Sequence, residues 1–183
     1  MKLVVIALED ELPQQLPEGY QKVVTGVGKV NAAIKLSQAL CKSTKPSAII
    51  NYGTAGIVSN KPLISQLVQP DVIIQRDMMA EPQAPRGVTP FEADATAGPI
   101  LMNTNTNITL GTGDSFVMSQ DPWFVYASID LVDMEAYALA KVAHTFNIPF
   151  KCYKYVSDFA DENAADTWQE NVAKGADLFQ AVL

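Results

Sequence analysis

Short runs of apolar residues recur along the whole chain and are separated by stretches with helical periodicity. Residues 2–8 form a continuous apolar run rich in Val and Ile, and residues 21–27 repeat the pattern. Runs of this kind are typical of strands that are covered on both faces. By the same reasoning, further strands are expected at residues 48–52, 71–75, 108–110, 129–132 and 150–156.

Helical repeats lie between several of these runs. Residues 29–42 are predicted to form a helix, and a second helix stops before Pro149. Asp121-Pro122 is typical of an N-cap followed by proline at the first helical position. A closing helix is expected over residues 166–182. The apolar faces of the first two helices are predicted from Val30, Ala33, Ile34 and Leu40, and from Ala136, Leu139, Ala140, Ala143 and Phe146.

The order of these elements predicts an α/β fold. Strands and helices alternate, and Gly-rich turns follow several of the strands, so a layered sheet covered by helices is expected. With 183 residues and no low-complexity linker, the chain is expected to form one domain over residues 1–183. The segment from Met78 to Thr106 contains several prolines and no regular period, and it is interpreted as a long loop.

Charge and composition narrow the class of protein. A net charge of −7 argues against nucleic-acid and anionic-membrane partners, which favour basic patches. No apolar run approaches the ~20 residues of a membrane span, and the N-terminal run is better interpreted as a strand than as a signal peptide. Cys41 and Cys152 have no metal or redox spacing, which predicts two buried free thiols in a cytoplasmic protein.

Three acidic residues stand where predicted strands end. Glu11, Glu135 and Asp158 are expected to converge, because open α/β sheets bind ligands at the carboxyl ends of their strands. Each also has a simpler explanation. Glu11 would be a solvated loop charge, Glu135 a first-turn helix acid favoured by the macrodipole, and Asp158 a helix N-cap or the partner of Lys154.

Several common chemistries lack support in the sequence. Gly26-x-Gly28 lacks the third glycine of a dinucleotide fingerprint, and no phosphate-loop Lys-Ser/Thr pair exists, which disfavours a nicotinamide oxidoreductase. The single histidine, His144, is predicted to have a surface or packing role. Without clustered histidines or cysteines, no metal site is expected. The turns at Gly26, Gly53 and Gly111 favour a shared ligand crevice.

The chain resembles the nucleoside phosphorylase/nucleosidase superfamily, and most closely the 5′-methylthioadenosine/S-adenosylhomocysteine nucleosidases. The resemblance implies a three-layer sandwich with a central mixed, mostly parallel sheet, and a homodimer without a cofactor. Segment 12–24 is shorter than usual in the family, and segment 78–99 matches less well. The matching blocks are Ile6–Glu11, Thr25–Ala33, Ile49–Ile57, Gly111–Val117 and Val132–Asp161.

The resemblance implies two catalytic residues. Glu11 matches the carboxylate that positions and deprotonates an attacking water, and Asp158 matches the acid that serves N7 of a purine. Cleavage of an N-ribosidic bond builds cationic character on the ribose and negative charge on the leaving base, so paired carboxylates fit this chemistry. The implied activity is release of adenine from 5′-methylthioadenosine or S-adenosylhomocysteine.

The resemblance also implies a set of substrate-binding residues. Phe116 matches an aromatic ring that stacks on the base, and Val117 a residue whose backbone reads the base edge. Met134 and Glu135 match the pair at the ribose, and Thr54 replaces the more usual serine near the sugar. Lys154 stands where relatives often have arginine.

Two other functions stay open at this point. A phosphate-dependent purine nucleoside phosphorylase would need arginines at the strand ends, whereas Arg76 and Arg86 are not on matching Gly-rich turns. Asn51-Tyr52 occupies the place before Gly53 where the related phosphorylases present an arginine. A non-catalytic nucleoside-binding module is the second alternative. The interpretation favoured by the residues is a nucleosidase that uses water.

Overall fold

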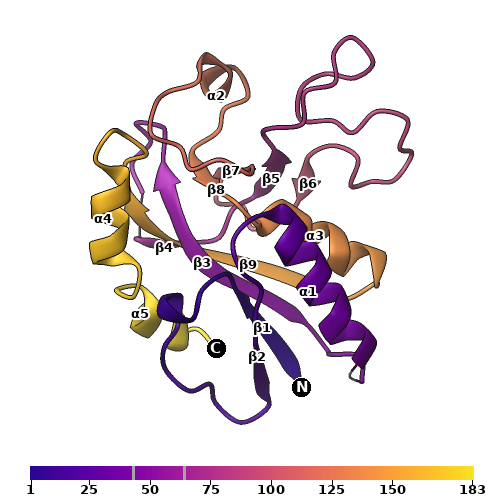
Figure 1. The fold of residues 1–183 in the computed structure, drawn as a ribbon, viewed down its shortest axis with the longest axis vertical. Coiled ribbons are helices and arrows are strands. Elements are labelled where there is room, and N and C mark those ends of the chain that lie inside the picture. The colour runs from indigo at the N-terminus through magenta and orange to yellow at the C-terminus, as the bar shows by residue number, and fades with distance from the viewer. Residues whose placement is uncertain (43, 64) are drawn as a thin grey trace.

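Nine strands form one mixed sheet within residues 1–42, 44–63 and 65–183, which the computed structural model describes (Figure 1). The strands are β1 (Lys2–Ile6), β2 (Tyr20–Val24), β3 (Ile49–Ile57), β4 (Leu67–Val68), β5 (Val72–Gln75), β6 (Ile100–Leu101), β7 (Thr109–Thr112), β8 (Leu131–Asp133) and β9 (Phe150–Asp158). The helices are α1 (Lys29–Lys42), α2 (Pro122–Tyr126), α3 (Ala136–Thr145), α4 (Ala164–Asn171) and α5 (Ala176–Gln180), and a 3₁₀ turn η1 spans Glu9–Glu11.

The sheet runs in the order β2-β1-β3-β8-β7-β5-β6, and β9 pairs with both β3 and β4. Parallel pairing joins β1 to β2 and β3, β3 to β9, and β7 to β5 and β8. Antiparallel pairing joins β3 to β8, β4 to β9 and β5 to β6. The mixed, mostly parallel sheet that was expected is therefore confirmed.

The alternation of side chains along β1 explains why helices cover both faces of the sheet. Leu3 and Val5 pack with Leu36 of α1 and Leu139 of α3. On the other face, Val4 and Ile6 share a core with α5. Figure 1 shows α1 and α3 on one side of the strands and α4 and α5 on the other. The result is the predicted three-layer sandwich.

Helix α1 has the predicted length, but its predicted apolar face is wrong apart from Leu40. The helix buries Ala32, Leu36 and Leu40 instead. Val30 is 66% exposed and Ile34 is 49% exposed. The sequence contains two apolar stripes with four-residue spacing, and the stripe that carries the leucines packs against the sheet and α3.

The closing helix was predicted as one element and is two. Helix α4 ends at Asn171, and α5 begins at Ala176 after Gly175. A Cβ atom on Gly175 would lie 2.3 Å from the ring of Tyr155, so a side chain there could not fit without a shift. The glycine lets the chain pass close to β9 between the two helices.

The segment from Met78 to Thr106 is mostly irregular, as expected, but it contains β6, which pairs with β5. The structure also contains β4, which was not predicted. The segment is tied to α3, because the hydroxyl of Tyr137 donates to the carbonyl oxygen of Thr96. Lys141 and Glu92 form an ion pair of 2.6 Å beside it.

The structure also tests predictions that were made for single residues. Cys152 is buried, as predicted, but Cys41 is exposed, so the prediction of two buried thiols is wrong for Cys41. Leu40 takes the buried position in the last turn of α1, and Cys41 does not share it. His144 lies at the surface, 3.7 Å from Asp94. Asp121 caps α2 by accepting from the backbone of Trp123, as predicted. None of the helices in the described residues has the length and apolar content that a membrane crossing requires.

Candidate active site

A cavity of about 170 Å³ opens where β3, β8 and β9 end, beside η1 and the start of α1. All of the binding and catalytic residues predicted from the sequence line this cavity. They are Glu11, Thr54, Phe116, Val117, Met134, Glu135 and Asp158. The structure therefore brings together residues that lie up to 147 positions apart along the chain (Glu11 to Asp158).

Glu11 is a buried carboxylate at the end of η1, only 4% exposed. One carboxylate oxygen accepts hydrogen bonds from the backbone N–H groups of Ala7, at 2.8 Å, and Leu8, at 3.1 Å. The other accepts from the backbone N–H of Thr54 at 3.1 Å and from its hydroxyl at 3.4 Å. The alternative interpretation of Glu11 as a solvated loop charge is wrong, because the backbone holds the carboxylate in a fixed orientation.

Gly53 makes this arrangement possible. A Cβ atom on Gly53 would lie 3.0 Å from Oε1 of Glu11 and 3.3 Å from Nζ of Lys154. Both charged side chains thus approach the backbone of β3 at a point where a larger residue would crowd them. The predicted turns at Gly53 and Gly111 are wrong, because Gly53 lies inside β3 and Gly111 inside β7. Gly53 instead serves the close packing of charged side chains against the strand.

Asp158 lies at a bulge at the end of β9. The pairing of β9 with β3 joins Val156 to Ala55 and then Asp158 to Gly56, so Ser157 is the extra residue. The Ser157 hydroxyl donates to Oδ2 of Asp158 at 2.7 Å, and the backbone N–H of Ala160 donates to Oδ1 at 2.9 Å.

The two simpler interpretations of Asp158 are wrong. Helix α4 has Asn163 at its N-cap position, so Asp158 caps no helix. Lys154 pairs with Asp133 and not with Asp158. A Cβ atom on Gly56 would lie 2.6 Å from Oδ1 of Asp158, so the backbone of β3 leaves this carboxylate just enough room.

Glu135 is a third buried carboxylate of the cavity, 8% exposed. It occupies the N-cap position of α3, yet its side chain makes no capping hydrogen bond to α3. Its Oε1 instead accepts from the backbone N–H of Gly28 at 2.8 Å, just before α1 begins. The macrodipole of α3 is therefore not what holds this side chain. Burial, followed by the nearby charge of Asp133, raises the pKa of Glu135 to about 7.

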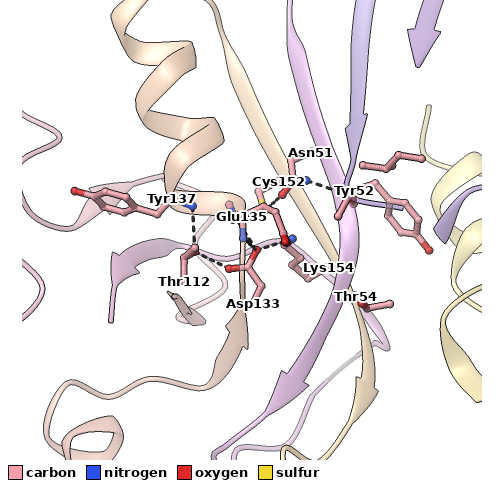
Figure 2. Close-up of polar contacts among 12 residues, drawn as sticks. Asn51, Tyr52, Thr54, Thr112, Asp133, Glu135, Tyr137, Cys152 and Lys154 are labelled. Carbon is pink, nitrogen blue, oxygen red and sulfur yellow. Dashed lines mark hydrogen bonds and ion pairs between the residues drawn. The ribbon is translucent and has the colours of Figure 1, made fainter. Parts of the chain in front are cut away.

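Asp133, in the cavity wall, and Lys154 form a network that the sequence did not predict. Figure 2 shows Asp133 at the centre of these contacts. Its Oδ2 accepts from Nζ of Lys154 at 2.8 Å and from the backbone N–H of Ala136 at 2.8 Å, while its Oδ1 accepts from the Thr112 hydroxyl at 2.6 Å. Burial alone would lower the pKa of Lys154, but Asp133, Cys152 and Glu135 raise it overall.

Arg76 lines the cavity, although the sequence placed neither arginine on a Gly-rich turn. Its side chain reaches the turn after β7 and is 4% exposed. The guanidinium donates to the carbonyl oxygens of Gly111, at 3.2 Å, and Gly113, at 3.0 Å, and to the hydroxyl of Ser115 at 2.9 Å. Arg76 thus fixes the loop that leads into Phe116, and its donors are used within the protein.

The rest of the cavity wall is largely apolar. Phe116 is 45% exposed at the rim, and Val117 and Met134 lie beside it. Trp168 of α4 also lines the cavity, and sequence reasoning missed it. The one available signal was a large aromatic residue in a short helix whose other residues are polar or alanine.

The site combines an apolar wall with buried carboxylates on different strands. Glu11 stands at the end of η1, Glu135 after β8 and Asp158 at the end of β9. Such a cavity can bind a flat apolar group and several hydroxyl groups, and it can move protons at two separate points. Among the described residues, no group of three or more His, Cys, Asp or Glu side chains is arranged to hold a metal ion.

Comparisons with known proteins agree with this geometry. The sequence model of the phosphorylase superfamily matches residues 22–183. A 5′-methylthioadenosine/S-adenosylhomocysteine nucleosidase of Haemophilus influenzae is 30% identical over 163 residues, which cover 80% of this chain and 71% of the relative. The Streptococcus pneumoniae enzyme of the same name, solved with a transition-state inhibitor, superposes with a TM-score of 0.76 and 25% identity, over 100% of this chain and 96% of that one.

A nucleosidase of Helicobacter pylori shows how far the fold extends beyond sequence similarity. It superposes with a TM-score of 0.82 at 18% identity and covers 98% of this chain and 94% of its own. Together with the site, these similarities place the sequence in a known group. The chain belongs to the phosphorylase superfamily and, within it, to the family of the 5′-methylthioadenosine/S-adenosylhomocysteine nucleosidases.

Proposed function

We propose that the protein hydrolyses the N-ribosidic bond of a purine nucleoside, 5′-methylthioadenosine or S-adenosylhomocysteine, and releases adenine. The observation that carries this proposal is the placement of two buried carboxylates, Glu11 and Asp158, in one cavity with an apolar wall. The names of the relatives support the same reaction, since they are nucleosidases for these two compounds.

In the proposed reaction, Glu11 accepts a proton from a water molecule as the water oxygen bonds to C1′ of the ribose. The bond from C1′ to N9 breaks, and its electron pair stays with the purine. Asp158 supplies a proton at N7, so adenine leaves as a neutral base. General acid–base assistance of this kind typically contributes ~10²–10⁴-fold in rate. The hydrogen bonds from Ala7 and Thr54 to Glu11 hold the base in place for this step.

The remaining cavity residues bind the substrate in this proposal. Glu135 accepts hydrogen bonds from the ribose hydroxyl groups, next to Met134. Phe116 stacks on the purine, and the backbone of Val117 contacts its edge. Thr54 lies near the sugar in this proposal, which its hydrogen bonds to the carboxylate of Glu11 support.

The charges in the cavity favour water over phosphate as the nucleophile. Glu11, Asp133, Glu135 and Asp158 all line it. The nearby cations are committed, because Arg76 donates to the loop that follows β7 and Lys154 pairs with Asp133. A phosphate dianion would meet the carboxylates of Glu11 and Asp133 and no free cation among the described side chains of the wall.

We also propose that the protein is a cytoplasmic homodimer. Large apolar side chains are exposed on α1, on the segment after β5 and on α2. Examples are Ile34 at 49%, Met79 at 62%, Phe91 at 93% and Tyr126 at 86% exposed. A second copy would cover such surface. Sedimentation velocity tests this: a species of twice the chain mass supports the dimer, and a monomer at micromolar concentration contradicts it.

Release of free base is the test of the reaction. Methylthioadenosine, adenosylhomocysteine, adenosine and inosine are incubated with the protein, with and without phosphate. Phosphate-independent adenine release, lost in Glu11→Gln and in Asp158→Asn, is the expected result. The matched controls are Glu9→Gln and Asp161→Asn, because both side chains are exposed neighbours of the catalytic pair.

The other outcomes are equally informative. Base release only in the presence of phosphate would make the protein a phosphorylase. Binding of a nucleoside without any base release would make it a non-catalytic nucleoside-binding module. Full activity of Glu11→Gln would remove Glu11 from its role as the base.

A further inference from the structure

Trp168 connects the C-terminal part of the chain to the cavity through a polar contact. It lies in α4, lines the cavity and is half-buried. Its indole N–H donates to the hydroxyl oxygen of Thr54 at 2.9 Å. Helix α4 is therefore joined to β3 by a directional hydrogen bond.

The hydrogen-bonding capacity of the two side chains fixes the direction of this contact. An indole nitrogen can only donate, so the Thr54 oxygen must accept from Trp168. The hydroxyl proton of Thr54 is then left to point elsewhere, and Oε1 of Glu11 lies 3.4 Å away as an acceptor. The same oxygen of Glu11 accepts from the backbone N–H of Thr54 at 3.1 Å. A chain of donors thus runs from Trp168 through Thr54 to Glu11.

A second hydrogen bond from α4 reaches the other catalytic strand. The side-chain amide of Asn171 donates to the carbonyl oxygen of Ser157 at 2.7 Å. Ser157 in turn donates its hydroxyl to Asp158. One helix therefore contacts residues that bond directly to each of the two carboxylates, on β3 and on β9.

We propose that Trp168 is a positioning residue for Glu11, acting through the Thr54 hydroxyl. With the indole donor in place, the hydroxyl group cannot turn its proton away from Glu11 without losing a hydrogen bond. The carboxylate then keeps one orientation toward the attacking water. This inference rests on the proposed nucleosidase reaction, because the orientation of Glu11 matters for the rate only if Glu11 acts on the nucleophile.

A double-mutant cycle on the full chain tests the proposal. The variants are Trp168→Phe, which keeps an aromatic wall but removes the donor, Thr54→Val, which removes the hydroxyl, and the two together. Trp123→Phe is the control, because Trp123 packs against Arg86 and is not among the residues that line the cavity. Steady-state adenine release gives kcat and KM separately, and thermal unfolding shows whether each variant is folded.

Coupled effects are expected. The kcat of Trp168→Phe should fall about fivefold, as expected for the loss of one hydrogen bond, with KM changed by less than about twofold. The kcat of Thr54→Val should fall about tenfold, and the double variant should be no slower than Thr54→Val, because the indole acts only through that hydroxyl. Trp123→Phe should keep the activity of the unsubstituted protein.

Three results would overturn the inference while leaving the proposed function intact. They are an unchanged kcat in Trp168→Phe, a rise in KM alone, and losses that multiply in the double variant. If Trp168→Phe does not fold, Trp168→Leu provides the same cycle, since leucine also has no side-chain donor for Thr54. If the unsubstituted protein releases no adenine, the proposed function fails and the inference fails with it.

Discussion

The ammonium group of Lys154 lies 2.8 Å from a carboxylate oxygen of Asp133, and neither side chain is more than 1% exposed. This pair joins β9 to the end of β8 at the wall of the cavity, and the backbone of α3 also depends on Asp133 through the N–H of Ala136. A buried pair of this kind costs desolvation energy, but the loss of one partner costs more, because the other charge stays buried alone.

We therefore expect Asp133→Asn to lower the free energy of unfolding by about 3–5 kcal/mol, since it leaves the Lys154 ammonium without a carboxylate. Glu92→Gln is the control, because it removes a partly exposed ion pair with Lys141 and should cost no more than about 1 kcal/mol. Urea unfolding of both variants checks this. Similar losses in the two variants would contradict the burial argument.

The raised pKa of Glu135 predicts a defined pH dependence of stability. In the folded protein this carboxyl keeps its proton up to about pH 7, whereas its ordinary pKa is 4.5. The folded state therefore holds more protons than the unfolded state between these values, and this contribution to stability is lost as the pH rises through the window.

Glu135→Gln removes that titration. Relative to the unsubstituted protein, the variant should gain stability between pH 4.5 and pH 7.5, by about 3 kcal/mol at most. Urea unfolding of both proteins at pH 5 and pH 7.5 measures the difference and cancels the titration of shared groups. A stability difference that does not change with pH would show that burial does not suppress the ionisation of Glu135.

The contact of Gly56 with Asp158 predicts a loss of activity from a single methyl group. In Gly56→Ala, the new Cβ would meet the Asp158 carboxylate at 2.6 Å, so the carboxylate must move. A displacement of about 1 Å at a reacting group can lower the rate about 10²-fold. Gly98→Ala is the matched control, because its nearest neighbour, in Val88, would lie 3.7 Å away.

Adenine release by both glycine variants gives the comparison. The expected result is a large fall in kcat for Gly56→Ala and no change for Gly98→Ala. Wild-type activity in Gly56→Ala would mean that the position of Asp158 does not limit the reaction.

The clamp made by Arg76 predicts an effect on substrate binding. Lysine lacks the planar fork whose separate nitrogens reach Gly111, Gly113 and Ser115, so Arg76→Lys should loosen the loop that leads into Phe116. Loss of aromatic stacking worth ~0.5–1.5 kcal/mol would raise KM by up to about tenfold. Arg86→Lys, at a residue outside the cavity wall that hydrogen-bonds to the backbone carbonyl of Arg76 and to Asp121, leaves the guanidinium of Arg76 in place and should keep KM unchanged. Equal KM values in the two variants would mean that the clamp does not position Phe116.

The fold could be predicted because local signals agree along the chain. The apolar run at 2–8, the periodicity of α3 and the Asp121-Pro122 cap each depend on neighbouring residues alone, and the structure contains the corresponding elements. Features set by distant contacts were not predictable in this way. The face that α1 buries depends on α3, and the break before α5 depends on Tyr155 of β9.

The same distinction between local signals and distant contacts applies to the residues of the candidate site. The sequence located Glu11, Glu135 and Asp158 because acidic residues at strand ends and a family resemblance pointed to the same positions. It did not locate Trp168 or the partner of Lys154, because hydrogen bonds between residues such as Thr54 and Trp168 leave no periodic trace in the sequence. Their discovery needed the side-chain contacts from α4 to Thr54 of β3 and from Lys154 of β9 to Asp133 of β8.

The bulge at Ser157 has a consequence for how this strand tolerates changes in length. An added residue in a regular strand moves every later residue one step along its neighbour, and it turns each side chain to the opposite face. Here the ladder resumes with Asp158 opposite Gly56, one step after Val156 opposite Ala55. The extra residue is accommodated at Ser157 alone, so Asp158 keeps its register with β3. The strand thereby gains a hydroxyl neighbour for Asp158 without displacing the group that the chemistry requires.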